Sequence, residues 1–153
     1  VFHEPVEPAL GYKFEYKDRV IVISGDTRYD SELIKSFKGA DVLFCEVISP
    51  DVVDRFIKVA EQQNDAKLKK ILVDILDYHT SPLEAVDLAN EAGVRHLVYY
   101  HLTPTLTTEI RFLSDKFFFE GVDEAIENWT ASTDGTMVVL PSNSKEILIS
   151  KIN

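Results

Sequence analysis

The chain has 153 residues, of which 45% are hydrophobic and 27% charged, and its formal net charge is -10. This composition is that of a globular protein, which excludes collagen-like, disordered and coiled-coil chains, and the acidic balance argues against a basic module that binds nucleic acid through its phosphates. No apolar run is as long as a membrane-spanning helix requires, so we expect no membrane partner. The single Cys45 excludes an internal disulfide framework and fits a reducing compartment, so we expect a cytoplasmic protein, with the periplasm as an open alternative.

Two strands are expected near the N-terminus. Residues 12–16 alternate aromatic and charged side chains, which predicts a half-buried strand, and Lys17-Asp18 follow as a tight turn. Residues 19–24 are rich in β-branched side chains, which predicts a strand buried on both faces.

Helices and strands then alternate. The apolar spacing predicts a short helix over 31–37, a buried strand over 41–47, a helical region over 53–76 with a polar break at 61–65, a helix from Ser81 to Gly93, and a strand over 94–100 that ends at His101. The start of the helix at Ser81 is the clearest signal, because Ser81 is a good N-cap, Pro82 fits the first position, and Glu84 can complete a capping box.

The C-terminal third mixes helices and hairpin strands. After Pro104 an apolar stripe predicts a helix that contains Ile110, Leu113, Phe117 and Phe118, and residues 122–129 predict a second short helix. A hairpin-type turn at Asp134-Gly135 and closing strands over 137–140 and 147–149 follow. The whole pattern predicts one α/β domain, residues 1–153, with a mixed sheet.

Polar side chains stand where three of these strands or their connections end. Asp26 follows Ser24-Gly25, His79 precedes the capped helix, and His101 ends the strand over 94–100. Ligand and catalytic groups of α/β proteins gather at such C-terminal strand edges. One carboxylate and two imidazoles suit zinc, and a bound metal generates a nucleophile for hydrolysis from water near neutral pH.

Each of these residues also has an ordinary structural interpretation. An Asp at a strand end, such as Asp26, commonly caps a turn, and a single His there is commonly a hydrogen-bonded surface or core residue. His96, inside its strand, is assigned to this structural class, and Cys45 is expected to pack as a small buried hydrophobe. Spacing alone therefore leaves both a metal site and a structural role open.

Three motifs in order resemble one enzyme family. They are Gly11-Tyr12-Lys13-Phe14 followed by Ile23-Ser24-Gly25-Asp26-Thr27, then the stretch 77–85 around His79-Thr80-Ser81, then the stretch 92–104 around His101. Over residues 1 to about 104 their order and spacing resemble the metallo-β-lactamase superfamily, in its ribonuclease Z and arylsulfatase-like branch, and residues 135–149 also fit. The resemblance implies half of a metallo-β-lactamase-type αββα sandwich, an α/β fold with a mixed sheet and helices on its outer face.

The resemblance also implies a role for each candidate residue. Asp26 matches the carboxylate that bridges two zinc ions, His101 matches the last histidine ligand of the second metal, and His3 matches a histidine that ligates the first metal. His79 matches a histidine near the scissile phosphate, and Glu46 matches an acidic residue that orients it. The implied metal ligands are therefore His3, Asp26 and His101, and the implied catalytic residues are Asp26, Glu46 and His79.

Hydrolysis at two metal ions is the activity that the resemblance implies. The complete site would hold two Zn²⁺ ions, with Mn²⁺ or Fe²⁺ as alternatives, and a metal-bound hydroxide would attack a phosphodiester or another ester, with RNA among the candidate substrates. Thr103 and Pro104 stand where ribonuclease Z has a Ser-x-Arg-Tyr run, a departure that argues against tRNA 3′-processing.

The family's His-x-His-x-Asp-His signature, which supplies most ligands of both metals, does not occur in these residues. Because the chain also begins with Val1 rather than Met, we expect it to correspond to the C-terminal half of such an enzyme. Half a site should hold zinc poorly, so we expect this chain by itself to be inactive. The expected partner is the missing N-terminal half or a second copy in a homo-oligomer.

Two other functions stay open at this point. The chain would be a non-catalytic fragment or an interaction module that folds by self-association, because half a sandwich exposes its core-facing sheet. A small-molecule-binding α/β module is the third possibility, although nothing in the sequence resembles a dinucleotide-binding or Walker A loop.

Overall fold

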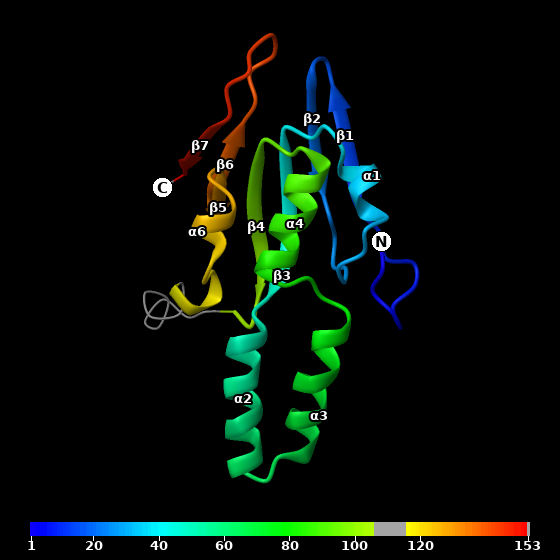
Figure 1. The fold of residues 1–153 in the computed structure, drawn as a ribbon, viewed down its shortest axis with the longest axis vertical. Helices are drawn as coiled ribbons and strands as arrows, with labels where there is room; N and C mark the ends of the chain where they lie inside the picture. The colour runs from blue at the N-terminus through cyan, green and yellow to red at the C-terminus, as the bar shows by residue number, and fades with distance from the viewer. Residues whose placement is uncertain (106–115, 153) are drawn as a thin grey trace.

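The computed structural model describes residues 1–105 and 116–152 (Figure 1). In chain order its elements are β1 (Tyr12–Tyr16), β2 (Arg19–Ile23), α1 (Leu33–Phe37), β3 (Val42–Ile48), α2 (Pro50–Gln62), α3 (Ala66–Asp74), the 3₁₀ turn η1 (Ile75–Asp77), α4 (Pro82–Ala92), β4 (His96–Thr103), α6 (Val122–Ala125), β5 (Trp129–Ala131), β6 (Thr136–Val139) and β7 (Leu148–Lys151). In this part of the chain, no helix is both long enough and apolar enough to cross a membrane.

The main sheet has five strands in the order β1-β2-β3-β4-β5. β1 pairs antiparallel with β2, whereas β2, β3, β4 and β5 run parallel to one another. β6 and β7 form a separate antiparallel pair. The prediction of an α/β fold with a mixed sheet is therefore confirmed, and the parallel strands bring their carboxyl ends to one edge, where the candidate site lies.

Helices α1 and α4 cover one face of the main sheet, with α4 lying over β3 and β4 (Figure 1). Their apolar side chains meet those of the two strands in the larger core cluster, which includes Phe37, Leu43, Leu88, Leu97 and Tyr99. Cys45 is buried in the same cluster, as predicted. This core fixes β3 and β4, the two strands that carry candidate site residues.

Helices α2 and α3 form a hairpin that projects beyond the carboxyl end of β3 (Figure 1). The break between them at residues 63–65 agrees with the polar break in the sequence. A second, smaller core cluster of Ile48, Val53, Ala60 and Leu72 joins the hairpin to the end of β3.

The capping signal of α4 is present as predicted. Ser81 Oγ accepts a hydrogen bond from the Glu84 amide, and the Glu84 carboxylate accepts one from the Ser81 amide. At the other end Gly93 adopts the left-handed conformation, with φ of 65°, which ends the helix. Because this cap directly follows His79 and Thr80, it holds the site loop to a rigid helix.

Two expectations differ from the structure, and a third lies mainly outside the described residues. The helix expected over 122–129 stops at Ala125, and Trp129 begins β5 because its backbone pairs with Leu97 and its ring packs on Tyr99. The half-buried strand expected over 12–16 is β1, but all five of its residues are exposed since no described element covers either face. The helix expected after Pro104 falls mainly on residues 106–115, which lie outside the described residues.

The end of the sheet opposite the site is held together by Asp41, which directly precedes β3. Its carboxylate lies 3.3 Å from Arg19 Nε and 2.5 Å from Arg95 Nη1. The two guanidinium groups in turn donate to backbone carbonyls of residues 144–146. Asp41 therefore fastens the segment between β6 and β7 to the main sheet.

Candidate functional site

Asp26 lies on the loop that leaves β2, as the sequence predicted. The chain turns there through Gly25, which has a φ of 66°. A Cβ atom at Gly25 would lie 2.2 Å from the Leu10 carbonyl oxygen, so only glycine fits this close approach of two segments. Asp26 then projects from the end of the strand with its side chain half-exposed.

His3 reaches Asp26 because the N-terminal segment is fastened to the same loop. The Phe2 amide donates to Thr27 Oγ1 over 3.0 Å, and the Phe2 carbonyl accepts from the Arg28 amide over 2.8 Å. The His3 ring is largely buried, and its Nε2 lies 4.0 Å from Asp26 Oδ2. Among the described residues this nitrogen has no hydrogen-bond partner, which is unusual for a buried polar atom.

Glu46 is fully buried, with 0% of its surface exposed. Its Oε1 accepts from the Thr27 and Thr80 amides, both over 3.1 Å, and its Oε2 lies 2.9 Å from His79 Nδ1. One carboxylate thus joins the loop after β2 to the loop before α4. The contact that the resemblance implied between Glu46 and His79 is present in the structure.

Burial by itself would lower the pKa of His79, but the hydrogen bond and charge of Glu46, assisted by the charge of Asp26, raise it above the ordinary histidine value. A raised pKa in the folded state stabilises the fold below the unfolded-state pKa, and this contribution is lost as the pH rises through the folded-state pKa.

We therefore expect metal-free protein to lose unfolding free energy as the pH rises from the ordinary histidine pKa of about 6.5 into the alkaline range, in excess of a His79→Gln variant. Urea denaturation in the presence of a chelator, repeated across this range for both proteins, measures the difference. Parallel pH profiles for the two proteins would contradict the raised pKa.

His101 occupies a β-bulge of β4 and does not end the strand. In the pairing of β3 with β4, Glu46 faces Tyr100 and Val47 faces Leu102, so His101 is the extra residue. Its φ is 46°, in the left-handed region that non-glycine residues rarely adopt. The bulge turns the ring toward Asp26, and His101 Nδ1 lies 3.5 Å from Asp26 Oδ1.

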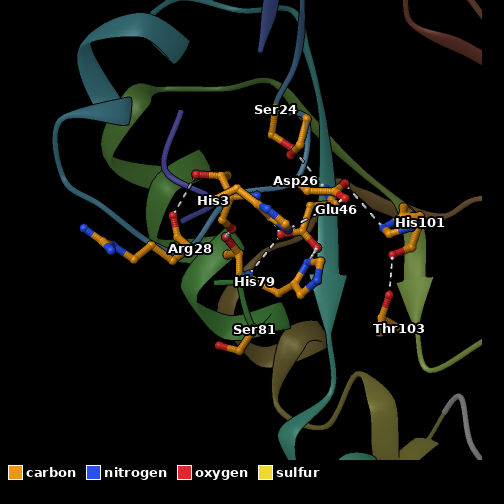
Figure 2. Close-up of polar contacts among 12 residues, drawn as sticks. His3, Ser24, Asp26, Arg28, Glu46, His79, Ser81, His101 and Thr103 are labelled. Carbon is orange, nitrogen blue, oxygen red and sulfur yellow. Dashed lines mark hydrogen bonds and ion pairs between the residues drawn. The ribbon is translucent and has the colours of Figure 1, made fainter. Parts of the chain in front are cut away.

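All five predicted residues thus meet at one edge of the sheet, and Figure 2 shows Asp26 between His3 and His101, with His79 held by Glu46. The two oxygens of Asp26 face different histidines. The tightest group is His3, Asp26 and His79, whose potential ligand atoms lie within 4.8 Å of one another. The geometry therefore groups His79 with His3 and Asp26, whereas the expected ligand His101 lies outside this group and contacts only Asp26 within it.

Comparison with known proteins finds several ribonuclease Z sequences as relatives. Over 104 residues, which are 68% of this chain, the sequence is 36% identical to ribonuclease Z of Mycobacterium tuberculosis (strain H37Rv) and 34% identical to ribonuclease Z of Mycolicibacterium gilvum. The chain belongs to the metallo-β-lactamase superfamily and is ribonuclease Z-like. The aligned stretch covers only 32% to 42% of the length of these and similar ribonuclease Z sequences.

A structural neighbour is more distant. A metallo-β-lactamase fold protein from Bacillus subtilis, YhfI, is a structural neighbour with a TM-score of 0.42 and 17% identity, covering 82% of this chain and 48% of that one. No family model matches the chain. The predicted membership of this superfamily is confirmed by the ribonuclease Z relatives.

The candidate site borders a cavity that sequence reasoning missed. It has a volume of about 580 Å³ and begins at Tyr100 and His101. Its far wall comes from Ser132, Thr133 and Asp134, in the connection between β5 and β6, and from Lys151 of β7. Nothing in the local sequence marks these residues, because only the docking of β5 beside β4 brings them to His101.

The hydroxyl groups that brace Glu46 were also missed. Ser24 Oγ accepts from the Glu46 amide over 3.1 Å, and Thr80 Oγ1 donates to the Thr27 carbonyl over 2.5 Å. All three hydroxyl residues are buried. They make the position of Glu46, and through it that of His79, part of a closed hydrogen-bond network.

Proposed function

We propose that this ribonuclease Z-like chain carries part of the active site of a metal-dependent hydrolase that cleaves a phosphodiester or another ester. The observation that carries the proposal is Asp26, whose two oxygens face His3 and His101 separately. A carboxylate placed in this way is suited to bridge two metal ions. The names of the relatives, ribonuclease Z, support the same class of reaction.

The donor set fits a zinc site. Imidazole and carboxylate are common zinc ligands, and the unpartnered, largely buried Nε2 of His3 is explained by an ion next to it. His3, Asp26 and His101 would hold the metal, with His79 close enough to join them. A bound divalent ion supplies a Lewis acid that lowers the pKa of water, and Mn²⁺ or Fe²⁺ are alternatives to Zn²⁺.

His79 is suited to move a proton. Its Nδ1 is engaged by Glu46, which leaves Nε2 as the ring nitrogen available to a substrate. Glu46 is thus a positioning residue that fixes the ring and keeps its pKa raised. Because its pKa lies above the ordinary histidine value, this ring is the better suited to donate a proton to a leaving oxygen.

The substrate class is a phosphodiester or other ester, with RNA among the candidates. The net charge of -10 gives no general attraction for phosphate, so binding must be local. Lys151, on the wall of the cavity beside His101, offers such a local positive charge. Thr103 and Pro104 stand where ribonuclease Z has a Ser-x-Arg-Tyr run, and because its Arg and Tyr are absent here, tRNA 3′-processing is the less suitable reaction.

Two metal ions need more ligands than His3, Asp26, His79 and His101 supply. We therefore propose that the remaining ligands come from a protein part outside residues 1–153 and that these residues alone do not hydrolyse esters. The free buried thiol of Cys45 agrees with a reducing, cytoplasmic location.

Zinc binding tests the site directly. We expect Asp26→Ala and His101→Ala each to weaken zinc binding by more than the roughly 10–100-fold that is typical when a residue supporting a metal ligand is removed. Isothermal titration of chelator-treated protein, with metal content measured by mass spectrometry, gives the affinity without requiring turnover.

His96→Gln is the matched control, because His96 lies on the same strand as His101 but bonds Thr130 at the far end. It should leave zinc binding unchanged. Zinc affinity that is the same in the parent chain, Asp26→Ala and His101→Ala would overturn the site assignment.

A further inference from the structure

A second cavity lies at the end of the main sheet where β4 begins, away from the candidate site (Figure 1). Its volume is about 460 Å³, which is within the range of sites for small molecules. The lining comes from the start of β4, from the residue before β5 and from the connection between β6 and β7, and consists of Val94, Arg95, His96, Asn128, Lys145 and Ile147. None of these residues is acidic, although the net charge of the chain is -10.

The charge of this cavity is positive and comes from Arg95 and Lys145. Burial lowers the pKa of His96, so its ring contributes no further charge near neutral pH. The carboxylate that pairs with Arg95 is Asp41, which lies outside the lining and also pairs with Arg19. One carboxylate shared by two guanidinium groups does not neutralise both, so a positive charge remains beside that of Lys145.

The acidic side chains near the cavity leave Lys145 without a partner. Among the described residues its ammonium group forms no ion pair. Asp18 is influenced by Lys145, but both of its oxygens accept from the Asn143 amide, over 3.1 Å and 3.0 Å. This amide is the main cause of the lowered pKa of Asp18, to which the charges of Arg19 and Lys145 add.

The same side chains have hydrogen-bond donors to spare. Arg95 donates one N–H to Asp41 and another to the Lys145 carbonyl, and a guanidinium group has more donors than these two contacts use. Within the part of the chain that the structure describes, the Lys145 ammonium and the Asn128 side-chain amide form no hydrogen bond. The bond from Arg95 to the Lys145 backbone holds two like charges at one cavity, an arrangement that an anion between them would stabilise.

We propose that this cavity binds the phosphate group of a small organic phosphate ester. The planar guanidinium of Arg95 and the ammonium of Lys145 donate charge-assisted hydrogen bonds to the phosphate oxygens, and the Asn128 amide adds a neutral donor. Val94 and Ile147, which are half-buried in the lining, border the apolar part of the ester. The site contains none of the candidate metal ligands, so it is independent of the hydrolase proposal.

A phosphate in this position joins β4 to the connection between β6 and β7. It would add to the attachment that Arg19 and Arg95 already provide through the carbonyls of residues 144–146. That connection leads into β7, whose Lys151 lines the cavity beside His101. We therefore expect bound phosphate to slow hydrogen exchange in residues 136–151, including part of the wall of the cavity near the candidate site.

A titration with inorganic phosphate tests the site. The ¹⁵N-labelled, chelator-treated protein is titrated at constant ionic strength, with chloride as the balancing anion, and the amide signals of Arg95, Asn128 and Lys145 should shift and saturate. Lys145→Gln should weaken phosphate binding roughly tenfold, because it removes one charged hydrogen-bond donor. It keeps the backbone carbonyl that Arg95 bonds, so the fold should be unchanged. Lys145→Arg should bind phosphate like the parent chain.

Two controls separate a specific site from general attraction. Lys58→Gln, at an exposed position of α2, removes the same charge and should leave phosphate binding unchanged. Phenyl phosphate adds an apolar ring and should bind more tightly than inorganic phosphate, and equal affinities would overturn the ester and leave a site for free phosphate.

Three results would overturn the site itself. They are no saturating shift up to roughly 100 mM phosphate, shifts confined to the amides around Asp26 and His101, and equal losses of affinity in Lys145→Gln and Lys58→Gln. None of these results depends on zinc binding or on ester hydrolysis, so the hydrolase proposal stands or fails separately.

Discussion

Replacing Glu46 with alanine is expected to lower the free energy of unfolding by about 3–5 kcal/mol, the range for removing one partner from a buried charged network. The Glu46 side chain is 0% exposed and accepts from the Thr27 and Thr80 amides while it contacts His79. Without it, these buried donors have no replacement partner in the described residues. Urea denaturation monitored by circular dichroism measures the loss.

Glu46→Gln should cost less, because an amide oxygen can still accept from the two amides. Glu61→Ala is the control, since Glu61 forms an exposed ion pair with Lys69 and should lose no more than about 1 kcal/mol. A Glu46→Ala protein no less stable than Glu61→Ala would contradict a stabilising role for the network around Glu46.

The second large effect is expected at the opposite end of β3. Asp41→Ala should lower the free energy of unfolding by about 3–5 kcal/mol, because it leaves the buried Arg19 without its carboxylate. It should also speed hydrogen exchange in residues 136–151, since Arg19 and Arg95 hold the Ser144, Lys145 and Glu146 carbonyls. Denaturation and exchange detected by mass spectrometry give the two readouts.

Asp54→Ala, at an exposed position of α2, is the matched control and should change neither quantity. Asp41→Ala could lower the free energy of unfolding and still leave the exchange rates in residues 136–151 at the parent values. The sheet would then be destabilised without any loosening of the C-terminal segment. That result would contradict the fastening role of Asp41.

The parts of the fold that were predictable are those with local signals. The helix from Ser81 to Gly93 begins at side chains that bond the nearby backbone and ends at a glycine in the left-handed conformation, so both ends of α4 were predicted correctly. Trp129 lacks such a signal, because a three-residue strand is determined by its neighbour Leu97. β1 showed the alternation of a half-buried strand, but alternation does not reveal whether anything covers the strand.

The candidate site also has parts that were visible in the sequence and parts that depend on the fold. The positions of Asp26, His79 and His101 at strand ends were visible from the sequence, whereas His3 and Glu46 were chosen through the family resemblance. The bulge at His101 was not predictable, because it arises from the pairing of β4 with Val47. The support of Glu46 by Ser24 and Thr80 was also hidden, since buried hydroxyl residues have no distinctive spacing.

The two carboxylates on either end of β3 imply an order of assembly. Glu46 bonds amides 19 and 34 residues away, whereas Arg19, the partner of Asp41, bonds the Ser144 carbonyl 125 residues away. Because closing a longer loop costs more entropy, contacts of high sequence separation are the slower ones to form. The edge that carries His79 and Asp26 can therefore be complete while β6 and β7 are still being synthesised, and the C-terminal segment closes last over a sheet that already exists.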